Sequence, residues 1–119
     1  MTKIADTRQR EGETWAEYDE RINMPWRQVR REFMARDDWE PVYEPWRHGG
    51  SYVSNIVYPS GAVGCIVSAR HSATGRFHVA CGPAELTEVK HKTRRAAAFA
   101  ERAYALQLWG EHDASRAAL

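Results

Sequence analysis

Four side chains in the middle of the chain have the types that could bind zinc or support thiol chemistry: Cys65, His71, His78 and Cys81. Structural zinc sites use closely spaced ligand pairs, and neither Cys65 with His71 nor His78 with Cys81 forms the usual pair. A thiol nucleophile also needs a nearby base and access to solvent. The strand pattern described below places both cysteines under a helix and His78 on the opposite face. We therefore expect two small core cysteines, no metal site and no enzymatic activity.

Two shorter patterns partly match known phosphate-binding and calcium-binding motifs but lack required residues. The run His48–Gly50 lacks the lysine and serine, or the further glycine, of a phosphate-binding loop. The acidic run 37–40 lacks the twelve-residue loop of alternating oxygen ligands that binds calcium. We expect no cofactor at either place.

Any site must be positioned by three β-rich runs and a helix in the second half of the chain. The runs are 51–58, 62–69 and 76–81, and the turn-forming segments 59–61 and 70–75 separate them. A helix is predicted over 93–109, with Thr93 as its N-cap and Gly110 as its stop. The segment 85–91 between sheet and helix is either a short fourth strand or a crossing loop. The fold class is therefore α+β, with a three-stranded antiparallel meander packed by a C-terminal helix.

A register follows from pairing Val57 with Val63 across the first turn. It places Val53, Asn55 and Val57 beside Val67, Cys65 and Val63. The same parity continued across the second turn pairs Cys65 with Cys81, Val67 with Val79 and Ala69 with Phe77. One face becomes valine-rich, and the predicted helix covers it with a stripe of Ala96, Phe99, Ala100, Ala103 and Leu106.

The first half of the chain is predicted to hold helices and an aromatic segment. Residues 1–12 form a flexible tail, and Thr14 begins a helix because Glu17 follows at capping-box spacing. Pro25 starts a second helix, whose apolar positions are Trp26, Val29, Phe33 and Met34. Prolines end that helix and leave a strap over residues 37–46. We expect one domain over 13–119, made of 13–46, a sheet-plus-helix unit over 47–110, and a tail over 111–119.

The second face of the sheet is predicted to be either an open functional surface or a second core layer. Open access is favoured by Arg76 and His78, whereas Ile56 and Ile66 favour cover by the N-terminal helices with their tryptophans. The residues predicted on this face are Tyr52, Ser54, Ile56, Tyr58, Ile66, Ser68, Arg70, Arg76 and His78.

Composition places the chain among single-domain proteins without a membrane span. It has 119 residues, 43% hydrophobic and 28% charged, with no apolar run near the ~20 residues that a membrane helix needs. The N-terminus has no apolar signal core, so we expect a cytoplasmic protein with reduced thiols. Residues 1–46 carry 8 basic and 11 acidic groups, and 47–119 carry 9 and 5. The net positive charge is therefore carried by residues 47–119.

The three strands followed by Thr-Arg-Arg-Ala-Ala-Ala-Phe-Ala resemble the arm DNA-binding domains of phage tyrosine integrases and the plant ethylene-response domains over residues 51–109. The Arg- and Ala-rich composition also resembles small accessory proteins of actinobacteriophages. The integrase resemblance implies that the sheet face would enter the major groove of double-stranded DNA. The residues that would contact DNA are Tyr52, Arg70, Arg76, His78, Lys90, Lys92, Arg94 and Arg95.

Protein binding is the main functional prediction, because five tryptophans and five tyrosines exceed what a small core easily buries. The strap residues Trp39, Tyr43 and Trp46 are the predicted contact surface. We expect a non-enzymatic, phage-encoded protein that engages a host protein in the host cytoplasm, with DNA binding as the alternative. The tripeptide over 107–109 resembles the opening of peptides that bind bacterial replication clamps, so the clamp is one candidate partner. A homodimer is also left open.

Overall fold

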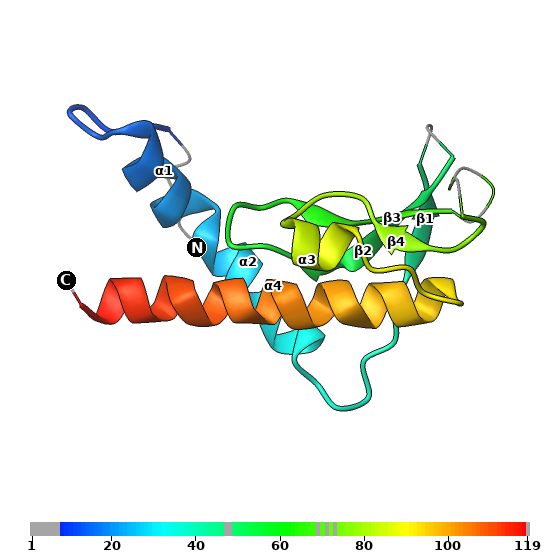
Figure 1. Cartoon of the computed structure of the whole chain (residues 1–119). Helices are drawn as coiled ribbons and strands as arrows, with labels where there is room; N and C mark the ends of the chain where they lie inside the picture. Colours follow the sequence, from blue (N-terminus) through cyan, green and yellow to red (C-terminus); the bar gives the residue numbers. More distant parts are fainter. Residues whose placement is uncertain (1–7, 47–48, 69, 71, 73, 119) are drawn as a thin grey trace.

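The computed structural model describes residues 8–46, 49–68, 70, 72 and 74–118. These residues form helices packed on a four-stranded antiparallel sheet with strand order β1-β2-β3-β4, which confirms the α+β class (Figure 1). No helix of the described residues is long and apolar enough to cross a membrane. The elements in chain order are α1 Trp15–Ile22, α2 Met24–Met34, β1 Tyr43–Pro45, β2 Ser51–Val57, β3 Val63–Val67, β4 His78–Val79, α3 Ala84–Thr87 and α4 Arg94–Ala117.

The long helix α4 lies along the sheet and extends past the β2–β3 hairpin (Figure 1). Its N-cap is Thr93, as predicted, because the Thr93 hydroxyl accepts a hydrogen bond of 3.0 Å from the Ala96 backbone N–H. The predicted inward stripe is wrong, since Ala96 and Ala103 are exposed and Phe99, Ala100 and Leu106 are only half-buried. The residues of α4 that are buried are Ala97, Ala98, Glu101, Ala105 and Trp109.

Gly110 does not end α4, which continues through the predicted tail to Ala117. Gly110 is exposed, and a Cβ added there would meet nothing within 4 Å. The substitution Gly110→Ala is therefore expected to raise the free energy of unfolding by about 0.5–1 kcal/mol in urea denaturation, because alanine has the higher helix propensity. Gly61→Ala is the control expected to destabilise, because Gly61 has a φ of 93° and lies against Arg27. A lower stability of Gly110→Ala would contradict an undistorted helix at this position.

The register between β2 and β3 differs from the prediction beyond its first pair. Val57 does pair with Val63, but the next pair is Val53 with Gly64, so residues 54–56 have no partner in β3. The segment just before β1 stabilises this irregular part of β2, because the Val42 carbonyl oxygen accepts a hydrogen bond of 2.9 Å from the Ser54 N–H. The Asn55 side chain also bonds to the backbone of residues 40 and 42.

The register between β3 and β4 is displaced by one residue from the prediction. Ile66 pairs with Val79, and Val67 pairs with His78. Because side chains alternate along a strand, a displacement by one residue places each side chain of β4 on the opposite face of the sheet from the one predicted relative to β3. Ile66 is consequently buried with Val79 under α4, together with Ile56, whereas Val67 is only half-buried. The two faces of the sheet therefore do not have the sets of side chains that the sequence predicted for the valine-rich face and for the functional face.

The fourth strand comes from the strap and not from residues 85–91. Tyr43–Pro45 forms β1 and pairs with β2 at the edge of the sheet. Residues 84–87 form the short helix α3, and an isolated bridge between Phe77 and His91 follows. The core cluster consists of Met24, Met34, Trp39, Val53, Ile56, Val57, Ile66, Val79, Ala97, Ala98, Ala105 and Trp109.

Candidate protein-binding surface

The strap residues that were predicted to contact a partner are turned toward the protein itself. Trp39 is only 6% exposed, its ring packs edge-on against Phe99 at 5.0 Å, and its Nε1–H donates to the backbone of Asn55. Trp39 is therefore a core residue, which corrects its place in the binding surface. Burial is favoured here because the ring fills the space between α4 and the irregular part of β2.

Tyr43 and Trp46 are half-buried by neighbouring side chains. The Arg94 guanidinium lies 3.7 Å from the centroid of the Tyr43 ring, and burial raises the Tyr43 pKa. The Trp46 ring lies 5.9 Å from the Tyr52 ring. These contacts stabilise the β1–β2 edge and leave only part of each ring for a partner.

Two of the cations predicted to contact DNA already have intramolecular partners. Arg95 forms an ion pair of 2.6 Å with Glu40, which lowers the pKa of Glu40. Arg94 stacks on Tyr43 and donates to the Ser51 hydroxyl at 3.1 Å. Binding of phosphate by either arginine would have to compete with these contacts.

The other predicted DNA contacts are spread over strand ends and loops. Burial and the Lys90 charge lower the pKa of His78, so this side chain adds no positive charge at neutral pH. Tyr52 is exposed, and its ring lies beside that of Trp46. The cations of this set that are exposed and have no ion pair among the described residues are Arg70, Arg76, Lys90 and Lys92.

The cysteines are not core residues, contrary to the prediction. Cys81 is exposed and Cys65 is half-buried, and both line one pocket beside α4. Burial, reinforced by Glu101, raises the Cys65 pKa to about 11, so its thiol stays protonated. His71 lies outside the described residues. Across the described ranges no group of three or more His, Cys, Asp or Glu side chains could hold a metal ion.

Helix α2 exposes three large apolar side chains, although the sequence left open whether the N-terminal helices cover the sheet as a second core layer. Its predicted apolar positions Trp26, Val29 and Phe33 are 70%, 47% and 61% exposed. Together with Arg30 they occupy positions i, i+3, i+4 and i+7, which is one side of a helix. We call these four residues the α2 outer face.

The opposite side of α2 is held by arginines that reach acidic partners on other elements. Arg27 bonds to Asp19 of α1 at 2.6 Å, and Arg31 bonds to Asp113 of α4 at 2.6 Å. The Arg31 guanidinium also lies 5.2 Å from the centroid of the Trp109 ring. These contacts, with the burial of Met24 and Met34, fix which side of α2 faces inward. The aromatic side is therefore left toward solvent.

A groove of about 440 Å³ adjoins the α2 outer face. Phe33 and Arg30 form one wall, Val57 and Val63 contribute apolar surface, and β2 adds the polar side chains of Ser54 and Asn55. Val63 is itself exposed. The helix face and the groove make a continuous surface with apolar and hydrogen-bonding groups.

Arg30 differs from its neighbours on α2. Within the described part of the chain Arg30 makes no hydrogen bond or ion pair, whereas Arg27 and Arg31 each have a carboxylate. Arg30 is exposed and lies among Trp26, Val29 and Phe33. The apolar surface therefore carries one positive charge that has no internal counter-charge.

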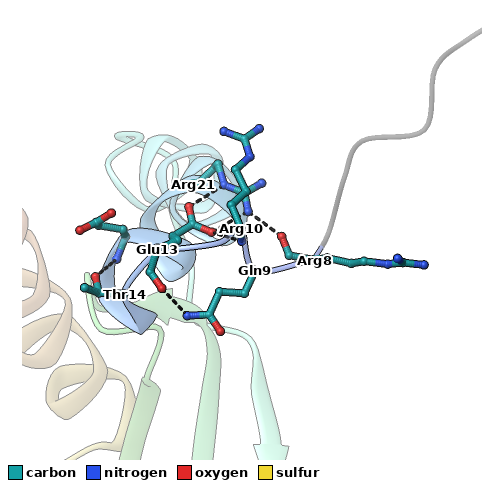
Figure 2. Close-up of polar contacts among 7 residues, drawn as sticks. Arg8, Gln9, Arg10, Glu13, Thr14 and Arg21 are labelled. Atoms are coloured by element: carbon teal, nitrogen blue, oxygen red, sulfur yellow. Dashed lines mark hydrogen bonds and ion pairs between the residues drawn. The ribbon is translucent and has the colours of Figure 1, made fainter.

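The segment before α1 is fixed to that helix by the Glu13 carboxylate (Figure 2). Glu13 accepts two hydrogen bonds of 2.8 Å from the Arg21 side chain and one of 2.9 Å from the Arg10 backbone N–H. These contacts, chiefly those of Arg21, lower the Glu13 pKa to about 2. Thr14 caps α1 as predicted, by accepting a backbone hydrogen bond of 3.1 Å. Trp15, 72% exposed on this fixed helix, is thus a matched reference for Trp26.

Comparison with known proteins finds no match to this chain among protein-family models, curated proteins or solved structures. The resemblance to integrase arm domains and to actinobacteriophage proteins stays a prediction.

Proposed function

We propose that this protein binds another protein through the α2 outer face and the adjoining groove. The observation that carries the proposal is the exposure of Trp26, Val29 and Phe33 on one side of a single helix. An exposed apolar cluster costs solubility unless a partner covers it, and tryptophan, phenylalanine and arginine are enriched where proteins meet. Covering these side chains would favour binding because it removes apolar surface from water. The proposal involves no catalytic step.

The partner that fits this surface presents an apolar side chain close to a carboxylate. The apolar side chain would enter the groove against Phe33 and Val63, and the carboxylate would meet Arg30. An arginine–carboxylate pair that is shielded by aromatic rings has a stronger interaction than one in open solvent. Charge complementarity therefore favours an acidic, partly apolar segment.

A second copy of this chain fits the surface less well. In a two-fold dimer centred on the α2 outer face, Arg30 would lie near the symmetry axis and approach Arg30 of the other copy. Like charges at the centre of an apolar interface are unfavourable because no solvent screens them. We therefore assign the surface to a different protein. The expectations of a host protein, and of the replication clamp as one candidate, stay predictions.

A peptide-display selection on the immobilised full-length protein tests this proposal. We expect the enriched peptides to carry an aromatic or aliphatic residue within a few positions of Asp or Glu. The variant Arg30→Glu should instead enrich Lys or Arg beside the apolar residue, because the sign of the central charge is reversed. Arg76→Glu is the matched control, since Arg76 is exposed, precedes β4 and does not line the groove, and it should leave the acidic preference unchanged.

The proposal is contradicted if no sequence is enriched, or if Arg30→Glu and the wild type enrich the same peptides. A dimer in light scattering that dissociates in Trp26→Ala would assign the surface to a second copy instead. Binding of a duplex DNA that Arg76→Ala with His78→Ala abolishes, and that Trp26→Ala leaves intact, would favour the DNA alternative.

A further inference from the structure

A pocket of about 310 Å³ lies beside α4, and a buried carboxylate is part of its lining. Glu101 is only 1% exposed, although glutamate is almost never fully buried without a cation beside it. No residue of α2 lines this pocket, and Val63 is the one lining residue that it shares with the groove beside α2. Its lining residues include Tyr58, Cys65, Cys81, Glu101, Tyr104 and Leu108.

The Glu101 carboxylate has two hydrogen-bond donors but no cation among the described residues. Its Oε2 accepts from the Tyr58 hydroxyl at 2.7 Å, and its Oε1 accepts from the Cys65 backbone N–H at 2.8 Å. A carboxylate can accept about four hydrogen bonds, so half of its capacity is left. The titratable side chains that share the pocket are tyrosines and cysteines, which are residue types that never carry a positive charge: Tyr58, Cys65, Cys81 and Tyr104.

Space for this carboxylate depends on a glycine in the facing strand. A Cβ at Gly64 would lie 2.9 Å from Glu101 Oε1 and 3.0 Å from the Cβ atoms of Val53 and Ile56. The irregular pairing of β2 with β3 begins at the same residue. The sheet is therefore shaped so that the carboxylate reaches it and still lines the pocket.

We propose that this pocket binds a small organic amine, whose ammonium group pairs with Glu101 and whose apolar body lies along Tyr104 and Leu108. The rings of Tyr58 and Tyr104 lie 6.0 Å apart, and aromatic rings beside a carboxylate are the groups that attract ammonium ions. The pocket has the size and the mainly apolar lining of small-ligand sites, with few polar groups to orient the ligand.

Ligand binding should be linked to a proton. Burial raises the Glu101 pKa to about 7, against the lowering effect of its two hydrogen bonds. An ammonium group favours the ionised carboxylate, so below pH 7 the ligand must displace a proton. We therefore expect the affinity to fall about fivefold from pH 7 to pH 6, while the amine itself stays charged.

Isothermal titration of the full-length protein with 2-phenylethylamine tests this site, and 2-phenylethanol is the uncharged ligand of matched shape. The amine should bind saturably at millimolar concentration and release a proton at pH 6, and the alcohol should bind about tenfold more weakly or not at all. Glu101→Gln should lose the preference for the amine, whereas Glu85→Gln, at an exposed position on α3, should keep it.

Three results would overturn the proposal: no saturable binding of the amine to the wild type, equal binding of the amine and the alcohol, or an unchanged preference in a folded Glu101→Gln. The first two are measured on the wild type. They decide the question even if Glu101→Gln does not fold.

Discussion

Replacing Trp109 with alanine is expected to lower the free energy of unfolding by about 3 to 5 kcal/mol. Trp109 is 1% exposed, and its Nε1–H donates a hydrogen bond of 2.8 Å to the Val57 carbonyl oxygen. Alanine would leave a cavity between α4 and β2 and an acceptor without its donor. It would also remove the ring against which Arg31 lies. The indole thus joins α4 to both β2 and α2, and its loss weakens both connections.

Urea denaturation followed by far-ultraviolet circular dichroism measures this effect without depending on tryptophan fluorescence. Trp15→Ala is the matched control, because Trp15 is 72% exposed, and its free energy of unfolding should change by less than about 0.5 kcal/mol. Trp109→Phe should fall between the two, since it keeps most of the volume and loses the hydrogen bond. A change below about 1 kcal/mol for Trp109→Ala would contradict the packing described.

The second large effect is a loss of stability as the pH rises, caused by Glu101. Its folded pKa of about 7 exceeds the ordinary value of 4.5 because burial penalises the charged form. The favourable contribution is thus fully present below pH 4.5, declines from there, and is lost once the pH has risen through 7. The difference between the two pKa values corresponds to about 3 kcal/mol.

Comparison of the wild type with Glu101→Gln isolates this contribution. Glutamine cannot ionise, so its stability relative to the wild type should increase by about 2 to 3 kcal/mol between pH 5 and pH 8. Other groups, such as His78, titrate in both proteins and cancel in the difference. A constant difference between the two proteins over this range would show that Glu101 ionises as in solvent.

Local signals in the sequence were sufficient for the N-caps of α1 and α4 and for the first pair of the β2–β3 hairpin. Thr14 and Thr93 cap α1 and α4 as predicted, because an N-cap depends only on residues within one turn. Val57 pairs with Val63 because the turn between them is short. The α+β class followed from the order of these elements.

Long-range contacts determined the features that the sequence did not reveal. The β3–β4 register depends on packing under α4 and not on a tight turn, so the sequence pattern does not distinguish the observed register from one displaced by one residue. The burial of Glu101 was not predicted. The two hydrogen bonds that offset its desolvation cost come from Tyr58 and from the Cys65 N–H, which lie 43 and 36 residues away in the sequence.

Trp39 was predicted to be accessible to a partner, and its burial was missed for the same reason. Trp39 and Trp26 both stood at apolar positions, and nothing local distinguishes the buried ring from the exposed one. The orientation of α2 is decided by Arg27 and Arg31, whose partners Asp19 and Asp113 lie on α1 and α4. The surplus of aromatic residues was the correct signal for an exposed cluster, whereas its location required the fold.

The most direct test of protein binding is the affinity of an enriched peptide for Trp26→Ala relative to Trp15→Ala, measured by fluorescence anisotropy of the labelled peptide. If the α2 outer face is the binding surface, Trp26→Ala should weaken binding by about 30-fold or more, as expected for an interface tryptophan worth about 2 kcal/mol or above. Trp15→Ala should bind like the wild type. Equal affinities for the two variants would contradict the proposed surface.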